Sequence, residues 1–317
     1  MNNTAWQGTD TLENVRRELE TLATEGVDQS LSDIDQRSTL DLVVAMNDYD
    51  KAVPLAVATA IPAIAIAVDA IASGLKSGGR LIYVGAGTPG RLGILDASEC
   101  PPTFGTDPSM VIGIIAGGSS AIDQAIEAVE DDAAAGAHDL AELHLSAEDS
   151  VVGISASGRT PYVIGALEYA ERIGATTIGV ACNEHSKVGK IARIAIEVPV
   201  GTEFIAGSTR LKAGTAQKLV LNMLTTLCMV RLGKTYGNVM VDLQATNEKL
   251  VARAERTIMA VTGVEANAAA RALSESNGSV KVAILALKGG FSPAAAREEL
   301  ASNDGILRQA LDHAASR

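Results

Sequence analysis

Residues Ser150–Leu167, SVVGISASGRTPYVIGAL, decide the fold of this chain. The apolar run SVVGIS predicts a buried β-strand, and PYVIGAL predicts a helix that begins directly behind the loop. The loop between them holds small hydroxyl side chains, a glycine and an arginine. Small hydroxyls and free backbone N–H groups at a helix N-terminus form a site for an anion, most often a phosphate. The stretch therefore predicts a strand, a phosphate-binding loop and a helix.

The loop also admits a plainer interpretation, in which Ser157 or Thr160 merely caps the helix. Capping requires one hydroxyl, whereas Ser155, Ser157 and Thr160 together supply three. We therefore assign the loop to phosphate binding, through Ser155, Ser157, Gly158, Arg159 and Thr160. Whether the Arg159 side chain faces the phosphate or points outward is left open by the sequence.

A second loop of the same kind, GAGTPGRLG over Gly85–Gly93, follows the predicted strand Arg80–Val84. Its glycines fit the G-x-G-x-x-G pattern of dinucleotide-binding folds, which also needs an acidic residue at the end of the next strand. That strand, in MVIGIIAGGSS over Met110–Ser120, ends in Gly and Ser instead. A phosphate or sugar-phosphate loop is therefore the better interpretation, and we expect Gly87 and Thr88 to contact the substrate.

Five short apolar runs separated by helical patterns predict a parallel sheet covered by helices on both faces. The runs are RLIYV (80–84), MVIGIIA (110–116), SVVGIS (150–155), TTIGVA (176–181) and IAIEVPV (194–200). We expect a three-layer α/β fold with the flavodoxin-like strand order 2-1-3-4-5, in which strands one and three are neighbours. Both phosphate-type loops follow these two strands, so the binding crevice is predicted at their carboxyl ends.

The chain divides into three predicted parts: an N-terminal helical segment over 1–70, the α/β domain over 71–246 and a small helical domain over 247–317. Residues 1–8 are expected to be disordered. The predicted helices are Thr11–Glu25, Ser38–Asp48, Val53–Ser77, Arg91–Ser98, Ser120–Gly136, Pro161–Ile173, Ala213–Leu232, Glu248–Val261, Glu265–Ser276, Ser279–Leu287, Ala294–Ser302 and Gly305–Ala315. The last five of these make up the C-terminal domain.

Composition and charge exclude several classes of protein. A formal charge of −12 argues against a nucleic-acid surface, because duplex binding needs Lys and Arg to neutralise phosphates. The longest apolar stretch, Ala52–Val68, is Ala-rich and contains Pro54 and Pro62, so it predicts a buried helix rather than a membrane span. The N-terminus lacks the basic start and apolar run of a signal peptide. We expect a cytoplasmic protein that binds neither nucleic acid nor membrane.

Neither the cysteines nor the histidines predict a metal site. The three cysteines, Cys100, Cys182 and Cys228, have no metal-ligand spacing, and their odd number argues against a disulfide framework. The four histidines show no i, i+4 pairing. We therefore expect a reducing environment, with no metal and no cofactor.

Glu99 and Glu130 are the carboxylates to weigh for acid–base chemistry. Glu99 lies in RLGILDASECPPTFG, where Pro101 and Pro102 are expected to end a helix near the crevice, and a helix-end surface charge is the alternative. Glu130 lies in AIDQAIEAVEDD among other acidic residues, a pattern that by itself indicates a solvated acidic face. The local sequence therefore gives Glu130 little support.

Four segments make the chain resemble the N-acetylmuramic acid 6-phosphate etherase family, which joins a sugar isomerase (SIS) domain to a small helical, UBA-like tail. The segments are GAGTPGRLGILDASECPPTFG (85–105), ISASGRTPYVIGALEYA (154–170), GSTRLKAGTAQKLVLNML (207–224) and YGNVMVDLQATNEKL (236–250). SASGRT alone indicates an SIS domain, whereas DASECPPT and STRLKAGTAQK together are highly specific. The resemblance extends from near Ala23 to the C-terminus.

The resemblance implies an activity: cleavage of the D-lactyl ether of N-acetylmuramic acid 6-phosphate by elimination and hydration. The products are N-acetylglucosamine 6-phosphate and D-lactate, in peptidoglycan recycling. It implies that Glu99 and Glu130 are the catalytic carboxylates. Glu130 thereby becomes a good catalytic candidate, although its local sequence indicates only a solvated acidic face. SIS domains often carry a serine where this chain has Pro89, so Thr88 and backbone N–H groups take over that phosphate contact or it is missing.

The resemblance also implies a homodimer with active sites near the interface. The helix Ala213–Leu232 is apolar on more than one face, which independently requires burial in the core or against a partner. Its lead-in, Gly207–Lys212, carries hydroxyls and cations. We expect Ser208, Thr209 and Lys212 to approach the substrate, either in their own subunit or in the neighbouring one.

Two other functions fit the same fold. One is a non-catalytic sugar-phosphate sensor like the glucokinase regulatory protein, which resembles this family but carries two SIS domains, whereas this chain has length for one. The other is an aldose–ketose isomerase, which would convert a sugar phosphate without releasing lactate.

Overall fold

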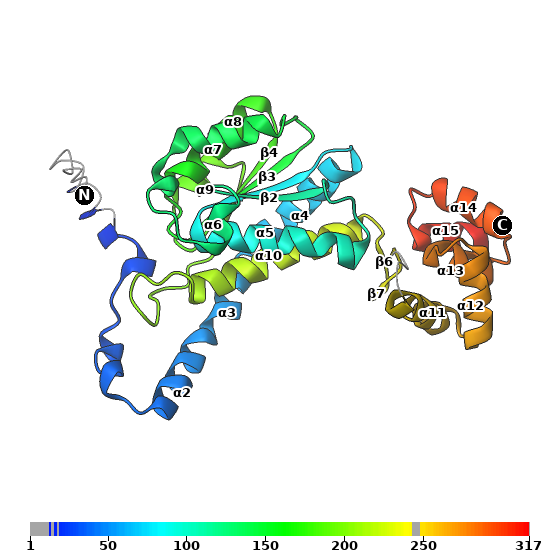
Figure 1. Cartoon of the computed structure of the whole chain (residues 1–317), viewed down its shortest axis with the longest axis horizontal. Coiled ribbons are helices and arrows are strands. Elements are labelled where there is room, and N and C mark those ends of the chain that lie inside the picture. Colours follow the sequence, from blue (N-terminus) through cyan, green and yellow to red (C-terminus); the bar gives the residue numbers. More distant parts are fainter. Residues whose placement is uncertain (1–12, 14–15, 18, 243–247, 317) are drawn as a thin grey trace.

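A parallel five-stranded sheet forms the centre of the molecule (Figure 1). The computed structural model describes residues 13, 16–17, 19–242 and 248–316, so the predicted disordered segment 1–8 and the start of the predicted helix Thr11–Glu25 lie outside the described residues. The strands are β1 (Leu81–Gly85), β2 (Val111–Ile115), β3 (Ser150–Ser155), β4 (Thr176–Ala181) and β5 (Ile194–Glu197). Their order, β2-β1-β3-β4-β5, confirms the predicted three-layer α/β fold.

The strand register brings both predicted loops to one edge of the sheet. β1 pairs in parallel with β3, with Gly85 opposite Ile154, so the loops that follow these strands leave the sheet side by side. On its other side β3 pairs with β4, with Ser155 opposite Ala181. Every residue of β1 and of β3 is buried, which explains why a central parallel strand is an unbroken apolar run in the sequence.

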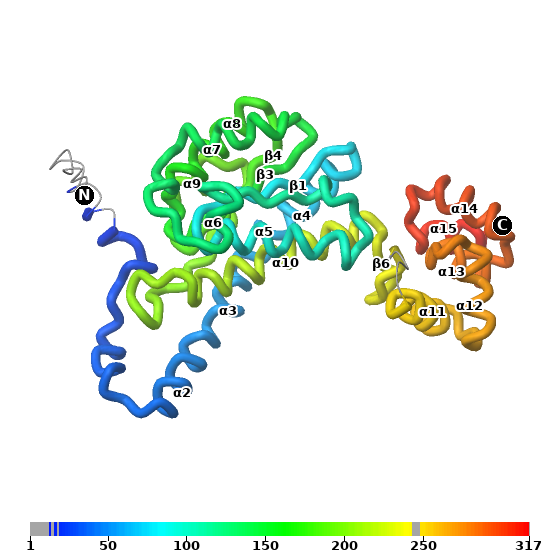
Figure 2. The backbone as a smooth tube through the Cα atoms, in the orientation of Figure 1, coloured from blue at the N-terminus to red at the C-terminus, as the bar shows by residue number. Residues whose placement is uncertain are grey.

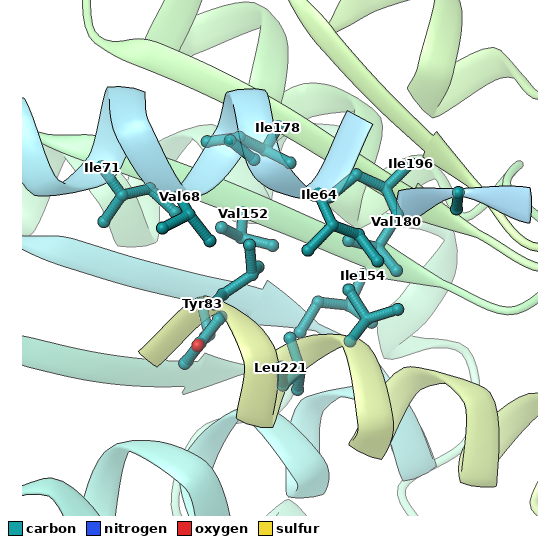
Figure 3. Packing of buried hydrophobic residues seen from close by; sticks show 14 of the residues in the cluster. Ile64, Val68, Ile71, Tyr83, Val152, Ile154, Ile178, Val180, Ile196 and Leu221 are labelled. Carbon is teal, nitrogen blue, oxygen red and sulfur yellow. The ribbon is translucent and has the colours of Figure 1, made fainter. Parts of the chain in front are cut away.

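Three helices cover one face of the sheet: α4 (Ile61–Lys76), α5 (Gly87–Phe104) and α10 (Lys212–Arg231). They share one hydrophobic core with alternate strand residues such as Tyr83. Figure 3 shows Leu221 of α10 in this core, together with side chains of α4 and of the strands. Burial of α10 in this core explains part of its apolar character on more than one face.

Three further helices cover the opposite face: α7 (Ala133–Glu142), α8 (Pro161–Ile173) and α9 (Lys187–Ile191) (Figure 2). They pack around the intervening strand residues, including Val84 and Val151. The bounds of α8 are those predicted, because a proline begins it and a glycine ends it. Helix α9 is absent from the prediction.

The predicted helix Val53–Ser77 is wrong in one respect, since it is two helices, α3 (Ala52–Thr59) and α4, that meet at Ala60. Pro62 stands in the first turn of α4, where its missing N–H costs no helical hydrogen bond. Among the described residues no single helix is long and apolar enough to cross a membrane. One pair of segments is long and apolar enough when taken together, by length and composition alone. It consists of α2 (Thr39–Asp50) with α3, followed by α4, and it is bent by 60°.

Helix α5 extends beyond the predicted helix Arg91–Ser98 at both ends. Pro101 and Pro102 lie inside it rather than ending it, although neither has an N–H to donate to the preceding turn. The carbonyl of Pro101 still accepts the N–H of Gly105, whose left-handed φ of 62° ends the helix. Glu99 therefore lies in the body of a helix and not at its end.

The predicted helix Ser120–Gly136 is also wrong. The structure has instead α6 (Ser120–Asp123), the 3-10 turn η4 (Val129–Asp131) and the start of α7. Ala128 adopts a left-handed φ of 65°, which no right-handed helix accommodates. Asp132 then caps α7 with its side chain. Glu130 consequently lies in η4, within an irregular segment between α6 and α7.

An N-terminal arm, residues 23–59, extends from the sheet domain and includes α2 and α3 (Figure 1). Tyr49 ties it to the body, because its hydroxyl donates to Asp28 Oδ2 (2.8 Å) and lies 2.5 Å from Thr202 Oγ1, in the segment after β5. Large apolar side chains remain exposed on the arm: Val27, Leu40, Val43, Val44 and Leu55.

The C-terminal helices form a unit with its own hydrophobic core. They are α11 (Glu248–Thr262), α12 (Ala266–Glu275), α13 (Val280–Gly289), α14 (Pro293–Ala301) and α15 (Leu307–Ala315), close to the five predicted helices. A short hairpin of β6 (Thr235–Tyr236) and β7 (Val239–Met240), absent from the prediction, packs against this core. The predicted boundary at residue 70 falls inside α4, and the one at 246 lies outside the described residues.

Candidate active site

The loop between β3 and α8, residues 155–160, is held together by hydrogen bonds of its own hydroxyl side chains. We call it the phosphate loop. Ser155 Oγ lies 2.8 Å from Thr160 Oγ1 and 3.4 Å from Ser157 Oγ. Ser155 Oγ also accepts the N–H of Gly158 (3.0 Å). Thr160 stands directly before α8, yet its hydroxyl makes no capping hydrogen bond. The plain-cap interpretation is therefore wrong for Thr160, and the three hydroxyls gather ahead of a helix N-terminus.

Gly158 adopts a conformation that the phosphate loop requires. Its φ is 75°, and a Cβ at this position would lie 2.4 Å from the Cβ of Ser186. Its carbonyl accepts the N–H of Val188 in α9 (3.0 Å). Ser186 is itself fixed by the Glu197 carboxylate, which accepts from its N–H and its hydroxyl, both at 2.8 Å. Helix α9 and Glu197, neither of them predicted to matter, therefore support the phosphate loop.

The loop after β1, residues 85–90, turns directly into α5, and we call it the glycine loop. A Cβ on Gly90 would lie 2.6 Å from Ile115 Cγ1 and 2.8 Å from the carbonyl oxygen of Gly85. Glycine at this position therefore lets α5 begin against the ends of the strands. Gly87 has a φ of 57° and opens the helix, which has no side-chain N-cap. Uncapped N–H groups of this kind suit an anion.

The lead-in to α10, residues 207–212, reaches the same region. A Cβ on Gly214 would lie 3.5 Å from Thr88 Cγ2, so the first turn of α10 packs beside the first turn of α5. The N–H of Gly214 donates to the carbonyl of Thr209 (2.9 Å). Thr209 and its neighbour Ser208 are thereby folded against the start of α10, close to the glycine loop.

Lys212 has other partners than the expected substrate. Its side chain is buried, and Nζ donates to the carbonyl of Val200 (2.8 Å) and lies 4.0 Å from the ring centre of Tyr49. Burial lowers the pKa of Lys212, and the Glu203 carboxylate opposes that shift. In the described chain Lys212 joins the N-terminal arm to α10.

Glu203 is a buried carboxylate that the sequence did not single out. It is 1% exposed and accepts the N–H groups of Lys212 (2.8 Å) and Ala213 (2.9 Å), so it caps the N-terminus of α10. A sequence search for helix caps misses it because it stands nine residues before the helix, far outside the usual capping position.

Glu130 lies beside the glycine loop. Together with Gly87 and Arg91 it lines a cavity of about 210 Å³. Arg91 donates to the carbonyl groups of Ile122 (2.8 Å) and Gln124 (3.0 Å), which anchors the irregular segment that carries Glu130. The side chain is exposed, as its acidic surroundings indicated, but the cavity joins it to one of the two predicted substrate loops.

Glu99 lies on α5, about 18 Å from Gly87 along the helix axis. It opens on a different cavity of about 310 Å³ between α5 and α10, which we call the α5–α10 cavity. The lining residues are Leu92, Leu95, Asp96, Glu99, Lys218, Leu221 and Asn222. Within one chain the structure does not bring Glu99 to Glu130 or to the phosphate loop, so the expectation that Glu99 lies at the crevice is not met there.

The chemistry available in these cavities is that of carboxylates, hydroxyls and backbone amides. Burial, followed by Asp96 and Glu99, raises the pKa of the Cys100 thiol to about 12, so this cysteine is not a thiolate near neutral pH. In the part of the chain that the structure describes, no group of three or more His, Cys, Asp and Glu side chains is placed to hold a metal ion.

A parallel sheet with a glycine loop after β1 and a hydroxyl-rich phosphate loop after β3 is the arrangement of an SIS domain. Two family models agree with this class. The model described as the glucokinase regulatory protein N-terminal SIS domain matches residues 63–171, and the SIS domain model matches residues 124–227.

Named relatives match nearly the whole chain. It is 56% identical to the N-acetylmuramic acid 6-phosphate etherase of Caldanaerobacter subterraneus subsp. tengcongensis, over 92% of this chain and 96% of the relative. It is 55% identical to the N-acetylmuramic acid 6-phosphate etherase of Streptomyces avermitilis, over 94% of this chain and 96% of that relative. Among solved structures, a phosphoheptose isomerase from Francisella tularensis is similar, with 22% identity and a TM-score of 0.48 over 62% of this chain and 98% of that one. The chain belongs to the N-acetylmuramic acid 6-phosphate etherase family.

Proposed function

We propose that the protein cleaves the D-lactyl ether of N-acetylmuramic acid 6-phosphate, as a carbon–oxygen lyase of peptidoglycan recycling in the cytoplasm. The observation that carries this proposal is the 56% identity to a named etherase over 92% of the chain. The phosphate loop supports it, because three hydroxyls and a helix N-terminus suit a sugar 6-phosphate. No cofactor is part of the proposal.

The reaction needs an acid and a base. In the open-chain sugar the C1 aldehyde acidifies the C2 proton. A carboxylate takes that proton, the C2–H electron pair forms a C2=C3 double bond, and the C3–O bond breaks as the lactate oxygen takes a proton from a carboxylic acid. Water then adds across the double bond, with its hydroxyl on C3 and a proton on C2. The net reaction consumes one water and yields N-acetylglucosamine 6-phosphate and D-lactate.

We assign Glu99 as the acid that protonates the leaving oxygen and Glu130 as the second acid/base group. A carboxylic acid that donates near neutral pH needs a pKa raised by burial or by a nearby like charge. Both glutamates line cavities of the described chain: Glu99 lines the α5–α10 cavity, and Glu130 lines the cavity beside the glycine loop.

The substrate's 6-phosphate is assigned to the phosphate loop. Its ligands in this proposal are Ser155, Ser157, Gly158, Arg159 and Thr160, with Gly87 and Thr88 of the glycine loop and Ser208 and Thr209 of the α10 lead-in beside them. Lys212 supports this lead-in through its contacts with Val200 and Tyr49.

The working form is a homodimer in this proposal. Glu99 and Glu130 line separate cavities of one chain, and about 18 Å of α5 separates Glu99 from Gly87, so one small sugar phosphate does not reach both. A second copy that sets its α5–α10 cavity against the glycine loop supplies the missing carboxylate. Leu40 and Leu55 of the N-terminal arm, 72% and 73% exposed, offer apolar surface for such a partner.

The decisive experiment is to incubate the purified protein with N-acetylmuramic acid 6-phosphate and to assay D-lactate and N-acetylglucosamine 6-phosphate together. An etherase releases both in equal amounts, an isomerase converts the sugar phosphate without lactate, and a sensor binds it without conversion. Water labelled with ¹⁸O should place the label on C3 of the sugar product, and deuterium oxide should place deuterium on C2. Folded protein that releases no D-lactate would overturn the proposal.

A further inference from the structure

The α5–α10 cavity places a cation beside the candidate acid. Lys218 of α10 and Glu99 of α5 both line it, and among its described lining residues Lys218 is the cation. Lys218 has no ion-pair partner among the described residues, whereas Lys234 and Lys281 both pair with Asp242. A lysine that lines a cavity without a carboxylate partner suits an anionic group of a ligand.

Asp96, the second carboxylate in the cavity, has other partners. It is 7% exposed, its Oδ2 accepts from the hydroxyl of Tyr83 (2.9 Å), and its Oδ1 accepts from Nδ2 of Asn222 (2.7 Å). Burial, and then Asp96 itself, raises the pKa of Tyr83 well above its usual value, so Tyr83 remains a donor. Asp96 is therefore satisfied by neutral donors and leaves Lys218 available to a ligand.

The rest of the cavity suits a small group with an apolar side. Leu92 and Leu95 form an apolar wall opposite the polar residues of α10, and Leu95 is 53% exposed. Because Asp96 occupies Nδ2 of Asn222, that amide has its oxygen left to accept a hydrogen bond. The volume of about 310 Å³ lies at the lower end for small-molecule sites.

We propose that Lys218 binds the carboxylate of the D-lactyl group and so selects the lactyl ether over sugar phosphates that lack it. This inference rests on the proposed function and deepens it. The lactyl carboxyl carbon is two bonds from the ether oxygen that Glu99 protonates, so one cavity serves both groups. The lactyl methyl then meets Leu92 and Leu95. Glu99 in its acid form is uncharged and does not repel the lactyl carboxylate.

The test compares Lys218→Met, which removes the charge at similar length, with Lys218→Arg, which keeps it. Lys76→Met, at the exposed end of α4, is the matched control. KM and kcat are measured for N-acetylmuramic acid 6-phosphate, and the inhibition constant is measured for N-acetylglucosamine 6-phosphate, which lacks the lactyl group. We expect Lys218→Met to raise KM by about ten- to a hundredfold, the range of a lost charge-assisted hydrogen bond. Inhibition by N-acetylglucosamine 6-phosphate should not change, and Lys218→Arg should recover most of the loss.

Two results would overturn the inference while leaving the proposed function intact. One is a wild-type KM in Lys218→Met. The other is an equal loss of affinity for both sugar phosphates, which would give Lys218 a general structural role. Wild-type protein that releases no D-lactate would instead remove the proposed function itself. Thermal unfolding of each variant checks that the fold is kept.

Discussion

Ser155 Oγ and Thr160 Oγ1 lie 2.8 Å apart, so a side-chain hydrogen bond joins the end of β3 to the start of α8. With Ser157 Oγ 3.4 Å from the same atom, the hydroxyls are held in one cluster before any ligand arrives. A cluster arranged in advance loses little side-chain entropy on binding.

Ser157→Ala and Thr160→Val should each raise KM for the sugar phosphate by about ten- to a hundredfold, since each removes one hydrogen bond to a charged phosphate. The value of kcat should change much less, because the phosphate does not react. Ser77→Ala, at the exposed end of α4, is the control. Inorganic phosphate should also inhibit the wild type more strongly than either variant. A wild-type KM in both variants would place the phosphate elsewhere.

Glu99→Gln and Glu130→Gln should each lower kcat by about 10² to 10⁴, the range for positioned acid–base groups. Release of D-lactate is the assay, and circular dichroism checks the fold. Glu127→Gln is a close control, because Glu127 lines the cavity of Glu130 without an assigned chemical role. A loss of no more than about tenfold in either catalytic variant would remove that residue from the mechanism.

Mixing the two inactive proteins tests whether the site is shared between subunits. After denaturation and refolding of equal amounts of Glu99→Ala and Glu130→Ala chains, about half of the dimers are mixed by random pairing under two-fold symmetry. If each site takes one glutamate from each subunit, every mixed dimer has one intact site, so about a quarter of wild-type activity returns. Sites built within one chain recover nothing, and that result would contradict the shared site.

Asp149→Asn should destabilise the protein by about 3 kcal/mol at neutral pH, because it weakens a nearly buried ion pair. The carboxylate accepts from Arg80 N (2.7 Å), Nε (3.1 Å) and Nη2 (2.8 Å), and from Ser146 N (2.8 Å). Burial raises the pKa of Asp149, but the hydrogen bonds from Arg80 and Ser146 outweigh it and hold the pKa below the usual 3.8.

A depressed folded-state pKa gives stability that is complete above the unfolded value and is lost as pH falls through the folded value. Urea unfolding should therefore show the difference between wild type and Asp149→Asn at full size at pH 7 and reduced near pH 2. A difference independent of pH would show that the pair contributes through packing alone.

The strands could be predicted because a central parallel strand is apolar on both faces. SVVGIS and TTIGVA coincide with β3 and β4 residue for residue. Helix α8 could be predicted as well, since Pro161 opens it and Gly174, with a φ of 90°, closes it. These signals are local, and local signals also placed the phosphate loop at the end of β3.

The two glutamates could not be placed in the same way. The segment before α7 has a helical sequence pattern, but Ala128 adopts a left-handed conformation, so Glu130 lies in the short 3-10 turn η4 and not in an α-helix. Glu99 was misplaced because α5 continues through Pro101 and Pro102 as far as Phe104. Lys212 is covered by Tyr49, which lies far from it in the sequence. Long-range contacts of this kind have no signature in one sequence.

In the proposed homodimer, the separation of Glu99 and Glu130 onto different cavities of one chain makes turnover depend on concentration. Under that proposal a lone folded chain would carry both carboxylates and yet catalyse nothing, because they would belong to two different half-sites. In the dilute limit the number of assembled sites follows the square of the chain concentration, by mass action. Specific activity would then rise with the amount of protein synthesised. At low expression the chains would be folded but inactive, because few of them would be paired.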